Sequence, residues 1–168
     1  MSPDAAWPAA QLPARVASWA ASLVEHGGRV LVVGGRPRDA CLGRTPRDLD
    51  LEVYDVSGAV LRRLLSDHGL VAHEEVGRAH PVGLVSGPDG ERFELSRVED
   101  DGRPGRSLAE RFAEQAGRRD LTINAMALDP VAGGGIDPFG GRADLAEGRL
   151  RYVDRERFGD DPLRVLRV

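Results

Sequence analysis

The sequence predicts an α+β domain built on a mixed sheet of about five strands, with helices flanking the sheet on one side. Short apolar runs rich in β-branched residues, at Arg29 to Val33 and Leu49 to Tyr54, are typical of buried strands. Apolar residues at three- and four-residue spacing flank these runs and indicate amphipathic helices. No repeat with a period of about 20 to 50 residues is present, which argues against a solenoid.

Composition sets the broad class of the protein. The chain has 168 residues, of which 41% are hydrophobic, enough for one domain that buries roughly 70% of its unfolded surface. The formal charge of −4 argues against a surface that coats nucleic acid nonspecifically, so any such contact must be local. Cys41 is the single cysteine, which excludes an internal disulfide. With no basic leader and no run of about 18 apolar residues, we expect a soluble cytoplasmic protein without a membrane partner.

The N-terminal third predicts a helix, a strand and a short helix. Residues 1–12 are rich in Pro and Ala and predict a loose lead-in. Leu12 to Glu25 has helical periodicity and is followed by two glycines, which end helices. The strand Arg29 to Val33 comes next, and Arg38 to Leu42 predicts a short helix.

The middle of the chain predicts a helix and a meander. Ser57 to His68 carries apolar residues on one helical face, with Ser57 as the N-cap. Three alternating segments follow, separated by Gly-containing turns: Val71 to Val76, Pro81 to Val85 and Arg92 to Val98. We expect them to extend the same sheet.

The last third is less regular. Ser107 to Gln115 predicts a helix, and Ile123 to Leu128 is a short apolar stretch that fits either a helix or a strand. Asp129 to Gly141 is rich in loop residues. Asp161 to Val168 has a proline in its first turn and predicts the start of another helix.

Gly34 and Gly35 end the first strand, with Arg38 three residues further on. Glycines at such a turn let backbone amides approach a phosphate, and the Arg fork can bind phosphate oxygens. A plain structural turn is the alternative. The spacing does not match a P-loop, which also requires a Lys, and all 23 basic residues are Arg.

Asp48 and Asp50 lie on the next predicted strand. Strand side chains alternate with period two, so both carboxylates project from one face and repel each other unless a cation lies between them. Magnesium bridging a triphosphate is the usual use of such a pair. In the alternative interpretation, both aspartates lie at a solvated edge and face water.

These residues belong to a longer pattern that resembles the class II nucleotidyltransferase family. This family comprises CCA-adding tRNA nucleotidyltransferases and bacterial poly(A) polymerases. This chain resembles the opening signature of the family at Val32-Val33-Gly34-Gly35-Arg36-Pro37-Arg38-Asp39 and at Asp48-Leu49-Asp50. Three later motifs follow in the order of the family, at residues 118–127, 136–145 and 158–167.

The resemblance implies the polymerase β-like nucleotidyltransferase fold and a role for each matched residue. Asp48 and Asp50 would be the catalytic residues that bind two Mg²⁺ ions, while Gly34, Gly35 and Arg38 would hold the triphosphate. The residues that would contact the incoming nucleotide are Arg119, Asp120, Asn124, Asp161, Arg164 and Arg167, of which Asp161 and Arg164 would read the edge of its base.

Many such sites contain a third carboxylate. Glu94 is the candidate, because it lies on a predicted neighbouring strand, and Glu91 is the alternative. The histidines show no pairing at metal-ligand spacing and are interpreted as structural or solvated.

The resemblance therefore implies an enzyme that uses ATP and CTP to add CCA or A residues to an RNA 3′ end, with tRNA as the expected acceptor. Residues 13–153 would form the catalytic head domain and 154–168 the start of the neck helix, after which the family continues into body and tail domains. Three alternatives are a non-catalytic nucleotide-binding module, the catalytic half of an enzyme whose body and tail are a separate chain, and transfer to another acceptor.

Overall fold

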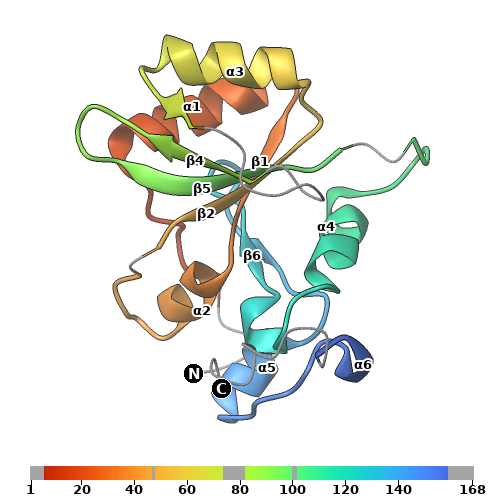
Figure 1. Ribbon diagram of the computed structural model, residues 1–168. Helices are drawn as coiled ribbons and strands as arrows, with labels where there is room; N and C mark the ends of the chain where they lie inside the picture. Colours follow the sequence, from red (N-terminus) through yellow and green to blue (C-terminus); the bar gives the residue numbers. More distant parts are fainter. Residues whose placement is uncertain (1–5, 47, 74–81, 100–101, 159–168) are drawn as a thin grey trace.

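The computed structural model describes residues 6–46, 48–73, 82–99 and 102–158. Within these ranges a seven-stranded sheet forms the centre of the fold, in the order β3-β4-β5-β2-β1-β6-β7 (Figure 1). The strands are β1 (Arg29–Val33), β2 (Asp50–Tyr54), β3 (Val71–Ala72), β4 (Val82–Ser86), β5 (Arg92–Arg97), β6 (Ala127–Leu128) and β7 (Gly135–Ile136). The helices are α1 (Ala14–Glu25), α2 (Gly35–Cys41), α3 (Gly58–Asp67), α4 (Leu108–Ala116), α5 (Gly141–Ala146) and α6 (Arg155–Phe158), with a 3₁₀ turn η1 (Thr122–Asn124).

The sheet is mixed, as predicted. Strand β2 pairs antiparallel with β1 and parallel with β5, and all other pairs are antiparallel. The predicted meander is confirmed, because β3, β4 and β5 follow one another and extend the same sheet. The strand count of about five was too low. The additional strands β6 and β7 have two residues each, too few for an alternating pattern to appear in the sequence.

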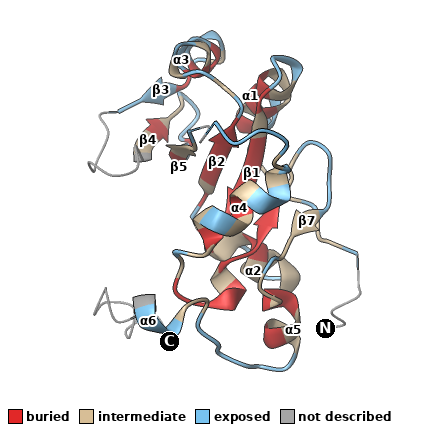
Figure 2. Ribbon diagram, turned by 90° about the vertical axis from the view of Figure 1, so that its right-hand side faces the viewer, coloured by how far each residue is buried: buried red, intermediate tan, exposed pale blue. Residues whose placement is uncertain are grey.

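Helices cover both faces of the sheet, so the prediction of helices on one side was wrong. On one face, α1 and α3 pack through Trp19 and Leu64 against a core that includes Val32 of β1. On the opposite face, Phe112 of α4 packs with Leu31. The reason lies in β1, which is buried along almost its whole length (Figure 2). Because strand side chains alternate between the two faces, its consecutive apolar residues must be covered on both.

Local signals explain where the helices begin. The Ser57 side chain accepts a hydrogen bond from the amide of Val60, at 3.3 Å, which confirms the predicted N-cap of α3. A capping box of Ser107 and Glu110 starts α4. Helix α2 begins at Gly35, earlier than predicted, because a proline such as Pro37 is tolerated in the first turn of a helix. The helix predicted from residue 161 lies outside the described residues.

None of the described helices is long and apolar enough to cross a membrane.

Candidate active site

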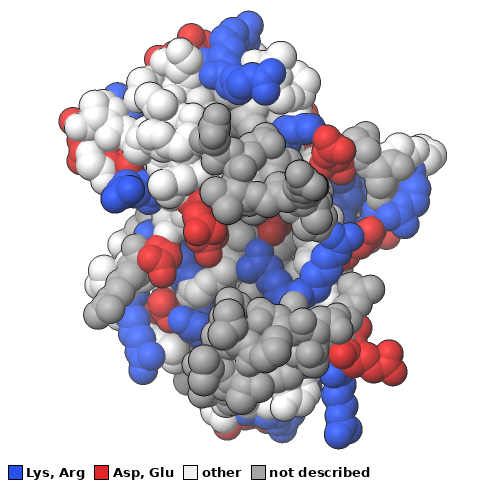
Figure 3. All heavy atoms as spheres, in the orientation of Figure 1, with Lys and Arg blue, Asp and Glu red and all other residues white. Residues whose placement is uncertain are grey.

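A pocket of about 810 Å³ lies where β1 ends and β2 and β5 begin. Acidic and basic side chains gather in the middle of this face of the molecule (Figure 3). The structure brings every described candidate residue into this one pocket: Gly34, Gly35, Arg38, Asp48, Asp50, Glu94, Arg119, Asp120 and Asn124. The remaining candidates, Asp161, Arg164 and Arg167, lie outside the described residues.

Three carboxylates line the pocket. Asp50 is the first residue of β2 and pairs in parallel register with Glu94 of β5. Asp48 precedes the strand and is exposed, so only Asp50 lies on the strand itself, although both aspartates line the same pocket. Within the described ranges, no three His, Cys, Asp or Glu side chains are grouped closely enough to hold a metal ion. The three carboxylates therefore share a pocket wall and are not gathered around one point.

The surroundings of Asp50 favour its neutral form. Burial raises the pKa of Asp50, and the charges of Glu94 and Asp48 raise it further, while Arg119 and Arg36 lower it. The negative charge at this point is thus not fully compensated by protein. A cation near Asp50 would relieve it, and hard divalent ions prefer carboxylate oxygen.

Glu91, the alternative third carboxylate, lies elsewhere. Its side chain is almost fully buried and accepts a hydrogen bond from Arg15 Nε at 3.0 Å. Arg15 belongs to α1, so this ion pair joins the turn before β5 to α1, away from Asp50.

The turn between β1 and α2 passes directly beside Asp50. Gly34 has φ +74° and ψ −137°, and a Cβ atom placed on it would lie 2.3 Å from Asp50 Oδ2. Only glycine fits both the conformation and the space. From α2, Arg38 donates to Asn124 Oδ1 at 2.7 Å and pairs with Asp39 at 2.8 Å.

The segment from Arg119 to Asn124 forms the opposite wall. Asp120 is buried, and its Oδ1 accepts hydrogen bonds from the Leu121 amide at 2.7 Å and from Asn124 Nδ2 at 3.0 Å. Since Asn124 also accepts from Arg38, this amide joins the two motifs across the pocket. Arg119 Nη1 donates to the carbonyl of Asn124 at 3.3 Å.

Sequence reasoning missed Glu52, which holds Arg119. Glu52 is buried and forms an ion pair with Arg119 at 2.8 Å, while its other oxygen accepts from the Tyr54 hydroxyl at 2.6 Å. Burial and the neighbouring Glu52 raise the pKa of Tyr54 above its ordinary value. The available signal was the period of two, which places Glu52 on the same strand face as Asp50.

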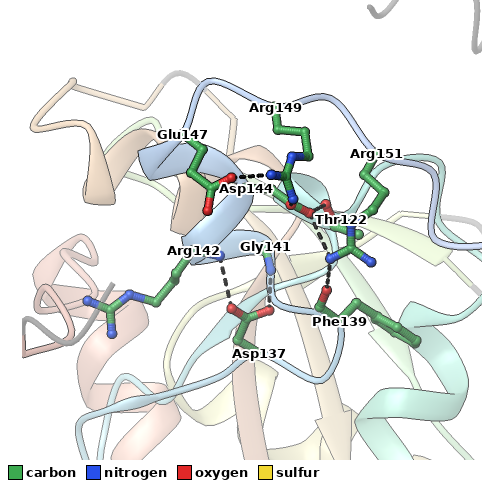
Figure 4. Close-up of polar contacts among 9 residues, drawn as sticks. All are labelled: Thr122, Asp137, Phe139, Gly141, Arg142, Asp144, Glu147, Arg149 and Arg151. Atoms are coloured by element: carbon green, nitrogen blue, oxygen red, sulfur yellow. Dashed lines mark hydrogen bonds and ion pairs between the residues drawn. The ribbon is translucent and has the colours of Figure 1, made fainter. Parts of the chain in front are cut away.

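A buried carboxylate of α5, Asp144, contacts η1 through Thr122 (Figure 4). Asp144 of α5 accepts hydrogen bonds from Thr122 Oγ1 at 2.5 Å and from Arg151 Nε at 2.9 Å. Burial alone would raise the pKa of Asp144, but these two hydrogen bonds and the charge of Arg151 hold it below its ordinary value. Gly141 lies so close to the turn that a Cβ atom would lie 2.2 Å from the Thr122 carbonyl oxygen.

The same figure shows why α5 begins where it does. Asp137 accepts hydrogen bonds from the backbone amides of Gly141, at 2.7 Å, and Arg142, at 2.9 Å. Arg151 also donates to the Phe139 carbonyl at 2.6 Å. The third motif, residues 136–145, is therefore held together by hydrogen bonds and supports the second motif, residues 118–127, through Asp144.

The class of protein to which this fold and pocket belong is identified by comparison with known proteins. Residues 30–151 match the family described as Poly A polymerase head domain, and the chain belongs to this family. Nucleotidyltransferases of this kind generally depend on a metal ion.

Individual relatives narrow the comparison. The chain is 40% identical over 147 residues to a multifunctional CCA protein of Leptothrix cholodnii and 39% identical over 147 residues to a CCA-adding enzyme of Alteromonas mediterranea. Each match covers 83% of this chain, and 33% and 34% of the two relatives. The chain thus spans about a third of the length of the curated relatives it matches.

Solved structures agree with the fold. The Thermotoga maritima CCA-adding enzyme complexed with tRNA matches with a TM-score of 0.74 and 27% identity, over 93% of this chain and 37% of that one. The Bacillus stearothermophilus CCA-adding enzyme in complex with CTP matches with a TM-score of 0.67 and 30% identity, over 93% of this chain and 38% of that one.

Proposed function

We propose that this chain is the catalytic head of a Mg²⁺-dependent nucleotidyltransferase that adds nucleotides from CTP and ATP to the 3′ end of an RNA, with tRNA as the acceptor. The single observation that carries the proposal is the pocket itself, where Asp48, Asp50 and Glu94 lie beside the Gly34 turn and Arg38. The relatives named for CCA addition, and the solved relatives with CTP and tRNA, support this choice of substrates. We expect the protein to act in the cytoplasm.

The two Mg²⁺ ions would be held by Asp48 and Asp50, with Glu94 as the third carboxylate of the same pocket. All three offer oxygen ligands. Burial is the main cause of the raised pKa of Asp50, and the charges of Glu94 and Asp48 add to it; a divalent cation would offset those two charges. When bound, the ions supply activation of the acceptor hydroxyl and stabilisation of charge on the α-phosphate and pyrophosphate.

The protein residues then bind and orient the substrate. The backbone at Gly34 and Gly35 can approach the triphosphate closely, and Arg38 supplies a guanidinium already oriented by Asn124. Arg119 is oriented by Glu52 in the same way. Such preorganisation lowers the cost of ordering side chains when the nucleotide binds.

Nucleotide contacts complete the proposal. Arg119 and Asp120 would contact the nucleotide near its sugar, and Asn124, which donates a hydrogen bond to Asp120, would add a contact to the nucleotide. Asp161 and Arg164 would bind the base edge with an acceptor and a donor fork, and Arg167 would add a contact one helical turn further on. The RNA grip would come from body and tail domains, in the same protein or in a separate chain.

Incorporation of each labelled nucleoside triphosphate tests the proposal. The chain is incubated with Mg²⁺ and either tRNA lacking its 3′ end or generic RNA, beside an Asp48→Ala/Asp50→Ala variant. Extension that depends on both aspartates is expected, and the preferred nucleotide and acceptor separate CCA addition from A tailing. Extension that survives loss of both aspartates would exclude the metal site as assigned.

A further inference from the structure

The N-terminal segment, residues 6–13, has no helix or strand but is attached to the domain. The indole of Trp7 lies against Gly135 of β7, where a Cβ atom would come within 2.4 Å of Trp7 Cδ2. The guanidinium of Arg142 stacks over the Trp7 ring, 4.4 Å from its centroid. Leu12 packs against the core beneath α1. The segment is therefore a fixed part of the fold on which another residue can be anchored.

Arg36 joins this segment to the loop that carries Asp48. Its Nη1 donates to the carbonyl oxygen of Gln11 at 2.8 Å, and its Nε donates to the carbonyl oxygen of Asp48 at 3.0 Å. The two acceptors are 37 residues apart in the chain. One planar guanidinium thus bridges them, which a lysine, with its single nitrogen, cannot do with the same geometry.

Asp48 needs such a constraint more than Asp50 does. Asp50 is fixed on both sides by the sheet, through Val33 of β1 and Glu94 of β5. Asp48 is exposed and precedes the strand, so the strand pairing does not fix its backbone.

We infer that Arg36 is a positioning residue, which holds the Asp48 loop against the N-terminal segment so that Asp48 stays in place for a divalent cation. The inference rests on the metal site of the proposed function.

The direction in which cation affinity changes when Arg36 is removed distinguishes a positioning role from a purely electrostatic one. The positive charge of Arg36 lies within electrostatic range of both Asp50 and Asp48. If Arg36 acted only as a charge, its removal would make the pocket more negative and would tighten cation binding. If Arg36 positions Asp48, its removal weakens cation binding because a ligand becomes mobile.

The test compares Arg36→Ala and Arg36→Lys with Arg63→Ala, which removes an equal charge from the exposed surface of α3. Calorimetric titration with Mg²⁺ and with Mn²⁺ alone measures cation affinity. Hydrogen exchange over residues 42–51 of the metal-free protein measures the mobility of the loop. We expect Arg36→Ala to weaken cation affinity about tenfold and to speed exchange in the loop, Arg36→Lys to fall between, and Arg63→Ala to match the unaltered chain.

Tighter or unchanged cation binding in Arg36→Ala would overturn the inference, as would unchanged hydrogen exchange. An Asp48→Asn variant makes the two proposals distinguishable. If Asp48→Asn leaves cation affinity unaltered, the proposed metal site is wrong, whereas exchange in metal-free Arg36→Ala still decides whether the tether exists.

Discussion

Substitution of Gly34 by Ala tests how closely the turn after β1 is fitted to the pocket. With φ +74° and ψ −137°, Gly34 occupies a region that other residues adopt only at a cost of about 1–3 kcal/mol. The added methyl group would also lie 2.3 Å from Asp50 Oδ2. The backbone strain lowers the free energy of unfolding, whereas the displacement of the Asp50 carboxylate lowers the rate of transfer. The two effects can therefore be measured separately.

The expected fall in kcat follows from the distance between the added Cβ atom and Asp50 Oδ2. Real Cβ atoms do not approach other atoms within 3.0 Å, so going from 2.3 Å to 3.0 Å moves the turn and the Asp50 carboxylate apart by about 0.7 Å. A misplacement of about 1 Å in an active site can lower a rate about 100-fold. We therefore expect kcat to fall about 30- to 100-fold and the free energy of unfolding to fall by about 2 kcal/mol.

Nucleotide incorporation measures the first effect and urea unfolding the second. Gly148→Ala is the matched control, because Gly148 also has a positive φ, +65°, but a Cβ atom there would meet nothing within 4 Å. The control should lose about 1 kcal/mol of stability and retain its turnover. A folded Gly34→Ala variant with the turnover of the unaltered chain would refute the reasoning.

Three further predictions concern buried charges. Because its raised pKa disfavours the ionised form, Asp50 contributes stability at low pH that is lost as pH rises through the folded pKa, so Asp50→Asn should raise the Tm in EDTA at pH 7 while abolishing transfer. A lower Tm would contradict this. Glu52→Ala leaves Arg119 without its ion pair and should cost about 2–4 kcal/mol in urea unfolding, whereas a cost below about 0.5 kcal/mol would show that the pair is energetically minor. Asp144→Asn should destabilise by about 1–3 kcal/mol at pH 7. Since the lowered pKa of Asp144 gives stability above the unfolded value near 4 that is lost as pH falls through the folded value, the difference from the unaltered chain should shrink below about pH 4. A difference independent of pH would show that the charge of Asp144 is not involved.

Elements with a long or strong pattern could be predicted from sequence. The strand Arg29–Val33 has the predicted bounds, and α3 begins at the predicted cap. Strands of two residues, such as β6, and the six-residue α5 give no periodic signal. They depend on contacts that form only in the folded chain.

The candidate site divides in the same way. Residue types and the family pattern placed Asp50 and Arg38 in one pocket, and Glu94 was inferred from a neighbouring strand. The pairing of Glu94 with Asp50 depends on a crossover between parallel strands. Glu52 escaped prediction because its ion-pair partner Arg119 is 67 residues away, and Asp144 because its hydrogen-bond donor Thr122 is 22 residues away. Neither contact produces a local pattern in the sequence.

The parallel pairing of β2 with β5 has a consequence for how the domain can vary. Adjacent strands lie about 4.8 Å apart wherever they pair. The distance between the backbones of Asp50 and Glu94 is therefore set by the pairing of β2 with β5 and not by the segments that connect these strands. The chain between the two strands includes α3, β3 and β4 and can lengthen or shorten without altering that spacing. Insertions in the connections outside β4, whose Leu84 pairs with Glu94, should be neutral for the site. A shift of β5 by a single residue, in contrast, would turn Glu94 to the opposite face of the sheet.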